Sequence, residues 1–241
     1  MIVDYQDAIA RLGIGSAHPG GFHTTEYWMD RVELRANDRV LEVGCGTGRT
    51  ACALYERFSC DIIGVDLHPM MIEKARQRAN QASVPVHFQR VAKGKLPFSA
   101  SSFDVLVAES VTVFNPINAQ LHEYKRVLKS GGMIIDTEMC AAASLPQEVA
   151  DEFKRFYKAR AVPTIKQWKA HYENTGFSDV RILLSAPVSH SPLSADVYDP
   201  FMQPTMDERA QEVMAIAEEN DRVMRMFGKW LQYAVIIGRN S

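Results

Sequence analysis

Cysteine is scarce in this sequence, and its four cysteines are poorly placed to act together. They stand at positions 45, 52, 60 and 140 of 241, form no CxxC pair and have no histidine at zinc-like spacing. Structural zinc sites take their ligands at short, regular intervals. We therefore expect reduced thiols, with neither a disulfide nor a metal site.

An excess of positive charge is also missing. The chain carries 27 lysine and arginine residues against 29 aspartate and glutamate residues, for a net charge of −2. Proteins that bind nucleic acids use clustered basic side chains to neutralise phosphates. A nucleic-acid partner is therefore disfavoured.

Neither a basic leader nor a long apolar run is present. Asp4 and Asp7 stand where a signal peptide would carry basic residues, and no apolar stretch is long enough to span a bilayer. A length of 241 residues with 46% hydrophobic content suits one domain with a sizeable core. We expect a single-domain, cytoplasmic protein with no membrane partner.

What the sequence does contain is a regular alternation of strand and helix patterns. Short apolar runs predict strands at 39–43, 61–65, 84–89, 103–108, 133–136, 180–185 and 230–237. Apolar residues at helical spacing predict helices at 24–34, 49–58, 69–80, 116–129, 147–160, 165–174 and 206–227. Gly131-Gly132 is expected to end the fourth helix, and a Thr164/Gln167 capping box to open the sixth. This alternation predicts an α/β fold, with helices on both faces of a mostly parallel sheet.

Three glycines follow the first predicted strand. Gly44, Gly46 and Gly48 form a GxGxG pattern at the start of a helix, where free backbone N–H groups can hold a ligand. A dinucleotide fingerprint places its third glycine one position later, where this chain has Arg49. At the end of the second strand, Asp66 is placed to accept both hydroxyls of a ribose, or alternatively to cap the next helix. Together these features indicate a nucleoside site rather than specifically a pyrophosphate site.

Four sequence motifs follow one another between residues 40 and 132. They are VLEVGCGTG at 40–48, GVDLHPMM at 64–71, LPF at 96–98 with SFDVL at 102–106, and RVLKSGG at 126–132, with a looser match at 175–180. The set resembles the class I S-adenosylmethionine (SAM)-dependent methyltransferases, and is similar to the small-molecule branch that includes the quinone C-methyltransferases. The resemblance implies a Rossmann-like sheet of seven strands whose last strand is antiparallel. It also implies an N-terminal lid arm at 1–34 and a substrate-covering elaboration at about 140–229.

The resemblance also implies which residues hold SAM and release S-adenosylhomocysteine. Glu42 and the glycine loop, including Cys45, would face the methionine part; Asp66 would hold the ribose, and Leu67 would pack on the adenine. Met71 closes the second motif, and Glu109 would lie where cofactor and acceptor meet. Ala92 stands where the family usually carries an acidic residue that reads the adenine amino group. Adenine recognition is then expected to use backbone groups or another side chain.

Methyl transfer needs a general base only if the acceptor must lose a proton, because the sulfonium already activates the methyl group. The candidates are His18 and His23 in the glycine-rich arm, Glu109 after the fourth strand, and Glu138 in the fifth. Each has a plainer alternative as an entry-loop, strand-end or surface residue. Aromatic and methionine residues after Glu138 either line an apolar acceptor pocket or belong to the core: Phe153, Phe156, Tyr157, Trp168, Phe201, Met202, Met224 and Met226.

The acceptor is expected to be a small molecule. The segment after the fourth strand, Glu109 to Thr112, lacks the Asn/Asp-Pro-Pro-aromatic element of amino-methylating nucleic-acid enzymes, and it holds no cysteine nucleophile. Two alternatives remain open. A non-catalytic SAM-binding protein is compatible with every motif, and an NAD-dependent oxidoreductase is opposed by Arg49 in place of glycine.

Overall fold

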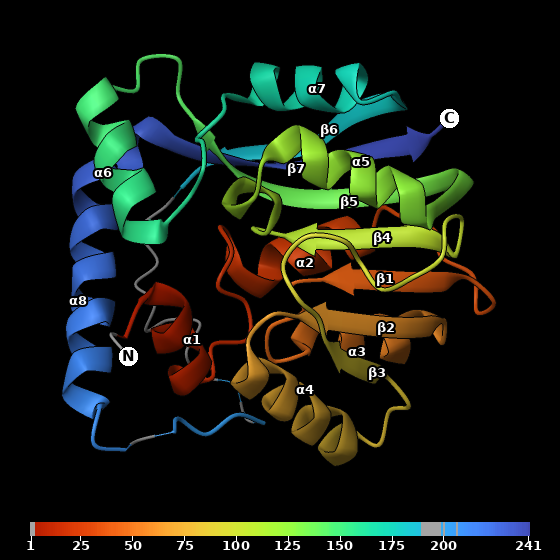
Figure 1. Cartoon of the computed structure of the whole chain (residues 1–241), viewed down its shortest axis with the longest axis horizontal. Helices are drawn as coiled ribbons and strands as arrows, with labels where there is room; N and C mark the ends of the chain where they lie inside the picture. The colour runs from red at the N-terminus through yellow and green to blue at the C-terminus, as the bar shows by residue number, and fades with distance from the viewer. Residues whose placement is uncertain (1–2, 189–198, 200, 206) are drawn as a thin grey trace.

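A computed structural model describes residues 3–188, 199, 201–205 and 207–241. Its centre is a seven-stranded sheet in the order β3-β2-β1-β4-β5-β7-β6 (Figure 1). The strands are β1 Arg39–Val43, β2 Asp61–Asp66, β3 His87–Arg90, β4 Phe103–Glu109, β5 Leu128–Ala141, β6 Phe177–Pro187 and β7 Leu231–Asn240. The first five are parallel, and β7 pairs antiparallel with both β5 and β6. The predicted α/β sheet with an antiparallel last strand is confirmed.

Eight α-helices and two 3₁₀ turns accompany the sheet in the described part of the chain. They are α1 Tyr5–Leu12, α2 Gly21–Met29, α3 Arg49–Phe58, α4 Pro69–Ala82, η1 Thr112–Phe114, α5 Ile117–Val127, α6 Gln147–Tyr157, α7 Ile165–Asn174, α8 Ala210–Phe227 and η2 Gly228–Trp230. Helices α3 and α7 have the predicted bounds, and Thr164 and Gln167 form the predicted capping box. Among the described residues, no helix combines the length and apolar character needed to cross a bilayer.

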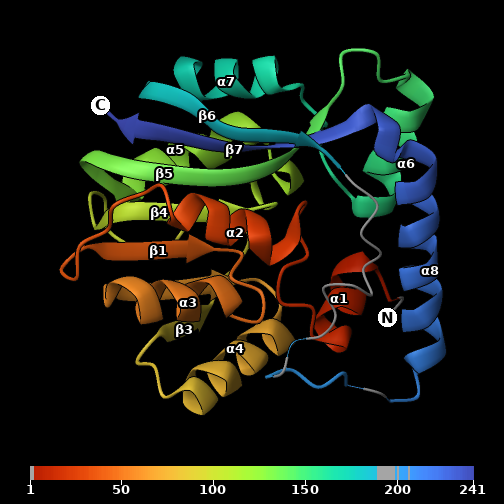
Figure 2. The same ribbon diagram turned by 180° about the vertical axis from the view of Figure 1, so that it is seen from behind.

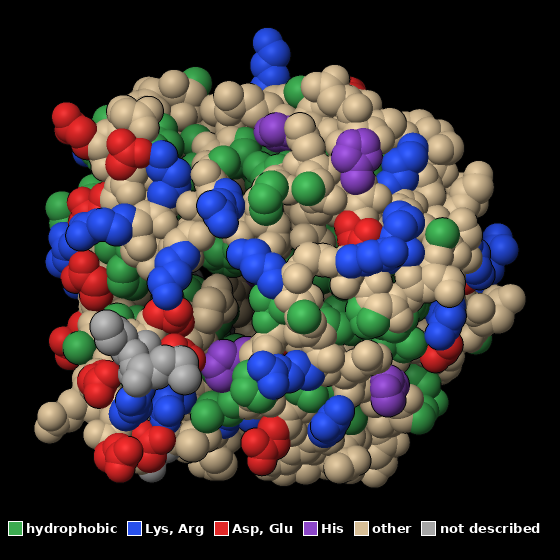
Figure 3. Space-filling model, in the orientation of Figure 1, with side chains coloured by type: hydrophobic (Ala, Val, Ile, Leu, Met, Phe, Trp, Pro, Cys, Tyr) green, Lys and Arg blue, Asp and Glu red, His purple; other side chains and the backbone are tan. Residues whose placement is uncertain are grey.

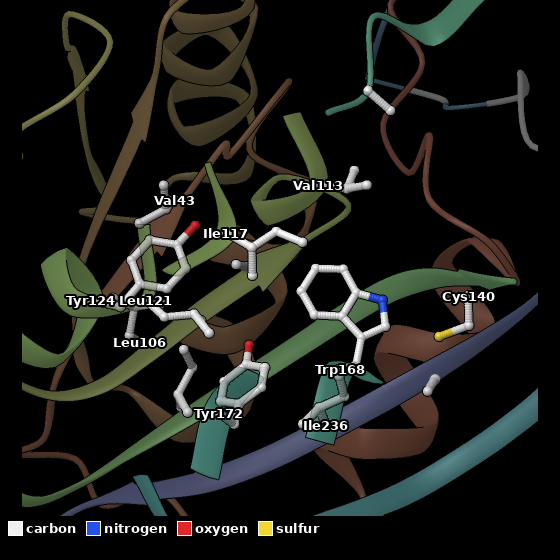
Figure 4. Close-up of a cluster of buried hydrophobic side chains, with 14 of the residues drawn as sticks. Val43, Leu106, Val113, Ile117, Leu121, Tyr124, Cys140, Trp168, Tyr172 and Ile236 are labelled. Carbon is white, nitrogen blue, oxygen red and sulfur yellow. The ribbon is translucent and has the colours of Figure 1, made fainter. Parts of the chain in front are cut away.

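Alternate residues of the inner strands pack into two separate hydrophobic cores, one on each face of the sheet. On one face, Leu41 and Leu106 belong to a cluster with Trp168 and Tyr172 of α7, shown in Figure 4. On the other face, neighbouring strand residues such as Val40 pack with side chains of α2, α3 and α4. This two-sided burial is the physical reason that the inner strands read as continuous apolar runs.

Several predicted boundaries were wrong. Helix α5 ends at Val127, and β5 begins at Leu128, so Gly131 and Gly132 lie inside a strand instead of ending a helix. Leu128 has extended backbone and pairs with Phe103, which explains the early start. The prediction also placed α2 too late, began β3 too early and omitted α1. Met206, where the last helix was expected to begin, lies outside the described residues.

Helices α1, α6 and α8 stand together beyond the carboxyl ends of the parallel strands (Figures 1 and 2). Ala8 of α1 packs with Val213 of α8 in a small apolar cluster, and Tyr5 contacts the rings of Phe156 and Tyr157 in α6. These three helices therefore form a wall over the edge of the sheet where α/β proteins bind their ligands.

Candidate active site

The glycine loop follows β1, and its glycines serve different purposes. All three have left-handed backbone, with φ of +70°, +51° and +77° at Gly44, Gly46 and Gly48. A Cβ atom would lie 2.3 Å from the Val111 side chain at Gly44 and 2.6 Å from Phe88 at Gly48, whereas at Gly46 it would meet nothing within 4 Å. Gly44 and Gly48 are therefore required by packing, and Gly46 leaves an open approach.

Asp66 closes β2 directly beside this loop. Its carboxylate accepts the backbone N–H of Gly46 at 3.0 Å and that of His68 at 2.8 Å. The N-cap of α4 is His68, so Asp66 does not cap that helix in the usual way. Burial raises the pKa of Asp66, partly offset by these hydrogen bonds. Leu67 follows with its side chain 48% exposed, as an apolar surface beside the carboxylate.

Glu42 lies buried in β1 with one unsatisfied oxygen. Its Oε2 has no hydrogen-bond partner among the described residues. Burial, and then the negative charge of Glu109, raise the pKa of Glu42 well above its ordinary value. A buried carboxyl oxygen without a partner is costly unless a ligand satisfies it. An N–H donor of a bound ligand, such as the amino group of SAM, would satisfy this oxygen.

Glu109 is a hydrogen-bond hub rather than a solvated strand-end residue. Its Oε1 accepts from Thr25 Oγ1 at 2.8 Å and from Trp28 Nε1 at 3.0 Å, and its Oε2 accepts from Thr50 Oγ1 at 2.7 Å. Its side chain is only 6% exposed, and Nε2 of His18 lies 3.5 Å from Oε2. The carboxylate thus joins the arm, α2 and α3 to the end of β4. Sequence reasoning missed the three donors, which lie 59 to 84 positions away along the chain.

The hydrogen bonds assign the protons of His18. Thr25 has one hydroxyl hydrogen, and it donates that hydrogen to Glu109. Its oxygen also lies 3.2 Å from Nε2 of His18, so this contact requires Nε2–H to be the donor. In the neutral ring, Nδ1 is then left as an acceptor, and it is buried with no partner among the described residues.

The other two proposed bases differ in position. The His23 side chain is 95% exposed and pairs with Glu26 at 3.2 Å, at the rim of the site. Glu138 is fully buried, and its Oε1 accepts the backbone N–H groups of Val111 and Thr112. Burial and the nearby Asp136 raise the pKa of Glu138 well above its ordinary value. Glu138 thus holds the chain after β4 in place.

A cavity of about 180 Å³ lies between the N-terminal arm and the wall of α1, α6 and α8. We call it the arm cavity. Its apolar lining includes Phe114, Met139, Phe153, Tyr157, Val188 and Met224. Its polar lining includes Ser16, His18 and Ser110, each with a buried atom that has no partner among the described residues. Of the aromatic and methionine residues considered from sequence, three therefore line the cavity, whereas Trp168 is core and Phe201 and Met226 are exposed.

Ser110 marks the junction between β4 and the cavity. It has left-handed backbone with φ of +55°, which is unfavourable for a residue with a side chain, and such residues gather at functional sites. Its own N–H donates to the carbonyl of Thr137 at 2.7 Å, which keeps it in place. Sequence reasoning missed Ser110 and Ser16, although Ser110 follows the selected Glu109 and Ser16 lies two positions before the selected His18.

Three further residues were expected at the cofactor site: Cys45, Met71 and Ala92. Cys45 is buried, its N–H donates to Val65, and burial raises the pKa of its thiol well above its ordinary value, so it is a poor nucleophile. Met71 is buried with Ile9 under α1. Ala92 is exposed in the loop after β3, next to Val91, whose N–H donates to the Asp66 carbonyl. On the surface, lysine and arginine side chains surround a hollow near the centre of one face (Figure 3).

The sheet order, the glycine loop and the carboxylate after β2 define a class I SAM-dependent methyltransferase. The chain belongs to the methyltransferase domain family, whose model matches residues 34–227. The resemblance seen in the motifs is confirmed, and the NAD-dependent oxidoreductase alternative is left without support. The similarity to quinone C-methyltransferases stays a prediction.

Individual relatives agree with this assignment. An uncharacterized protein of Haemophilus influenzae is 32% identical over 71% of both chains. The uncharacterized methyltransferase YodH of Bacillus subtilis is 26% identical over 89% of this chain and 94% of its own length. A phosphoethanolamine N-methyltransferase of Haemonchus contortus, solved with phosphomonomethylethanolamine and S-adenosylhomocysteine, superposes with a TM-score of 0.76 at 16% identity. That match covers 97% of this chain but only 57% of the nematode enzyme, and at this identity it shows the fold alone.

Proposed function

We propose that this enzyme transfers the methyl group of SAM to a small molecule held in the arm cavity. The observation that carries the proposal is the position of His18, whose ring contacts Glu109 on one side and lines the cavity on the other. Glu109 in turn accepts from Thr50, in the first turn of the helix that follows the glycine loop. The cavity therefore adjoins the site that the glycine loop and Asp66 provide for the cofactor.

The cofactor is held by groups that the fold has already placed. Glu42 receives the ammonium of the methionine part, Asp66 accepts the ribose hydroxyls, and Leu67 covers one face of the adenine. Gly46 leaves the backbone accessible to the ligand. SAM supplies an electrophilic methyl group on a sulfonium, so the protein has to align the acceptor with it and exclude water.

The elements around the cavity supply that exclusion. Helices α1, α6 and α8, which fall within the lid arm and the elaboration expected from the sequence, stand beyond the carboxyl ends of the parallel strands (Figures 1 and 2). His18 is the base for an acceptor that must lose a proton, and Glu109 stabilises the charged imidazole. His23 and Glu138 are not assigned a catalytic role.

The test is methyl transfer from radiolabelled SAM to a panel of quinones, phenols, carboxylic acids and amines, with RNA and DNA included. We expect at least one small molecule to be methylated and nucleic acids not to be. His18→Ala should lower turnover about 10²-fold while SAM affinity stays within a few-fold. His122→Ala, an exposed histidine in α5, is the matched control. Unchanged turnover in His18→Ala would contradict the role of His18, and preferred methylation of nucleic acid would contradict the proposal.

A further inference from the structure

We propose, resting on the function above, that the acceptor is an uncharged molecule about the size of one aromatic ring, carrying a weakly acidic hydroxyl group. A phosphate ester does not fit the same cavity. Three independent features of the arm cavity support this: its polar end, its apolar body and its charge.

The polar end of the cavity includes three buried atoms that lack a hydrogen-bond partner within the described chain. Ser16 Oγ, His18 Nδ1 and Ser110 Oγ all line the cavity, are buried, and have no partner among the described residues. Each buried polar atom left unpaired costs about 1–3 kcal/mol. Hydroxyls can donate or accept, and Nδ1 accepts, so together they suit an O–H group that donates to His18 and accepts from a serine.

The body of the cavity is apolar and small. Rings of Phe114, Phe153 and Tyr157 and the side chains of Met139 and Met224 line it. The volume of about 180 Å³ is slightly above the roughly 150 Å³ of an engineered apolar cavity that binds benzene. One aromatic ring with its hydroxyl therefore fills the space.

The described lining of the cavity offers a phosphate no lysine or arginine, and its only basic side chains are His18 and His23. Two nearby ammonium groups contact other groups, since Lys158 pairs with Asp4 and the exposed Lys93 reaches the Phe114 carbonyl at 3.5 Å. Burying a phosphate without a counter-charge is strongly unfavourable. A phosphate ester such as the phosphomonomethylethanolamine bound by the nematode enzyme is therefore not expected in this cavity.

The reaction balances with groups already present. The acceptor hydroxyl gives its proton to Nδ1 of His18 as its oxygen bonds to the methyl carbon. The carbon–sulfur bond of SAM breaks, its electron pair stays on sulfur, and S-adenosylhomocysteine leaves. Glu109 stabilises the resulting imidazolium until the proton passes to water.

The experiment compares matched neutral and charged probes by calorimetry on the protein saturated with S-adenosylhomocysteine. We expect phenol to bind at least about tenfold more tightly than phenyl phosphate or phosphoethanolamine. Ser110→Ala should weaken phenol binding about five- to tenfold, whereas Ser178→Ala, at an exposed position in β6, should not. Met224→Lys should shift the preference toward phenyl phosphate.

The outcomes separate this proposal from the proposed function. Tighter binding of phenyl phosphate or phosphoethanolamine to the unmodified protein would overturn the acceptor class. So would the absence of phenol binding to a protein that still binds S-adenosylhomocysteine and still methylates another member of the panel. Failure to bind S-adenosylhomocysteine or to methylate any small molecule would instead contradict the proposed function.

Discussion

Nε2 of His18 lies 3.5 Å from Oε2 of Glu109, and both side chains are almost completely buried. Glu109 also accepts hydrogen bonds from α2 and α3, so it connects the arm to the glycine-loop helix. The pair therefore links the residue proposed to meet the acceptor with the element proposed to hold the cofactor.

If the pair acts as a unit, the effects of its two replacements should not add. Glu109→Gln leaves an amide that cannot accept all the hydrogen bonds of the carboxylate, and we expect it to lower kcat by about 10²-fold, as His18→Ala does. The kcat of the double variant should be at most about threefold lower than the kcat of either single variant. Steady-state kinetics checks this, with Glu56→Gln, an exposed residue, as the control. Additive losses would show that the two residues act separately.

Glu42→Gln should weaken binding of S-adenosylhomocysteine by about tenfold or more, because an amide cannot become the carboxylate that would pair with the ligand's ammonium. Without ligand, the free energy of unfolding should not fall, since the change removes a buried acid whose pKa is already raised. Calorimetry and urea denaturation measure the two quantities. A loss of stability without a loss of affinity would contradict the ligand-binding role.

Alanine substitutions at Gly48 and Gly46 should affect different properties: mainly stability at Gly48 and mainly cofactor affinity at Gly46. Gly48→Ala places a methyl group against Phe88 and should cost about 2 kcal/mol or more of stability. Gly46→Ala has open space, so it should cost less than Gly48→Ala but lower cofactor affinity about tenfold. Gly131→Ala, also left-handed and unobstructed but far from the site, controls for backbone strain. If Gly46→Ala and the parent bind the cofactor equally well, the cofactor does not lie against Gly46.

Arg78 should be important for stability through a buried ion pair. It is paired with Asp199, and its Nε donates to the Thr47 carbonyl in the glycine loop at 2.8 Å. Arg78→Met or Asp199→Leu alone leaves an unpaired buried charge and should cost about 3 kcal/mol, with the double variant costing less than the sum. Asp30→Ala, which breaks an exposed pair with Arg57, should cost under about 1 kcal/mol. Urea denaturation of the full cycle decides whether the coupling exists.

Stability should fall as pH rises through the titration of Asp136. Burial raises the pKa of Asp136 to about 7, against an unfolded value near 3.9. Between these pH values the folded chain binds more protons than the unfolded one, so the free energy of unfolding decreases as pH increases. Asp136→Asn should be stabilised relative to the parent by about 2–3 kcal/mol more at about pH 8 than at about pH 5. The exposed Asp151→Asn should show no such difference, and parallel pH profiles for Asp136→Asn and the parent would refute the assignment.

Local patterns were sufficient to predict the strand, glycine and helix unit around Gly44, the carboxylate at Asp66 and the capping box at Thr164. Each depends on residues within a few positions of one another, where backbone preferences and side-chain periodicity act directly. Helix α1 had such a signal too, since Asp4 and Asp7 form a capping box and Gly13 ends the helix with left-handed backbone. Its eight residues are too short a stretch for helical periodicity to be recognised in the sequence.

The sequence by itself determined the family, the cofactor and the α/β class of the fold, because those follow from short motifs whose members are neighbours in the chain. Only the tertiary structure decided that His18 faces Glu109, that Ser16 and Ser110 share one cavity, and that Glu138 is not among its lining residues. These contacts join residues tens of positions apart, and they depend on how α1, α6 and α8 pack over the sheet. Local periodicity carries no information about that packing, so the proposed acceptor site could be identified only from the folded chain.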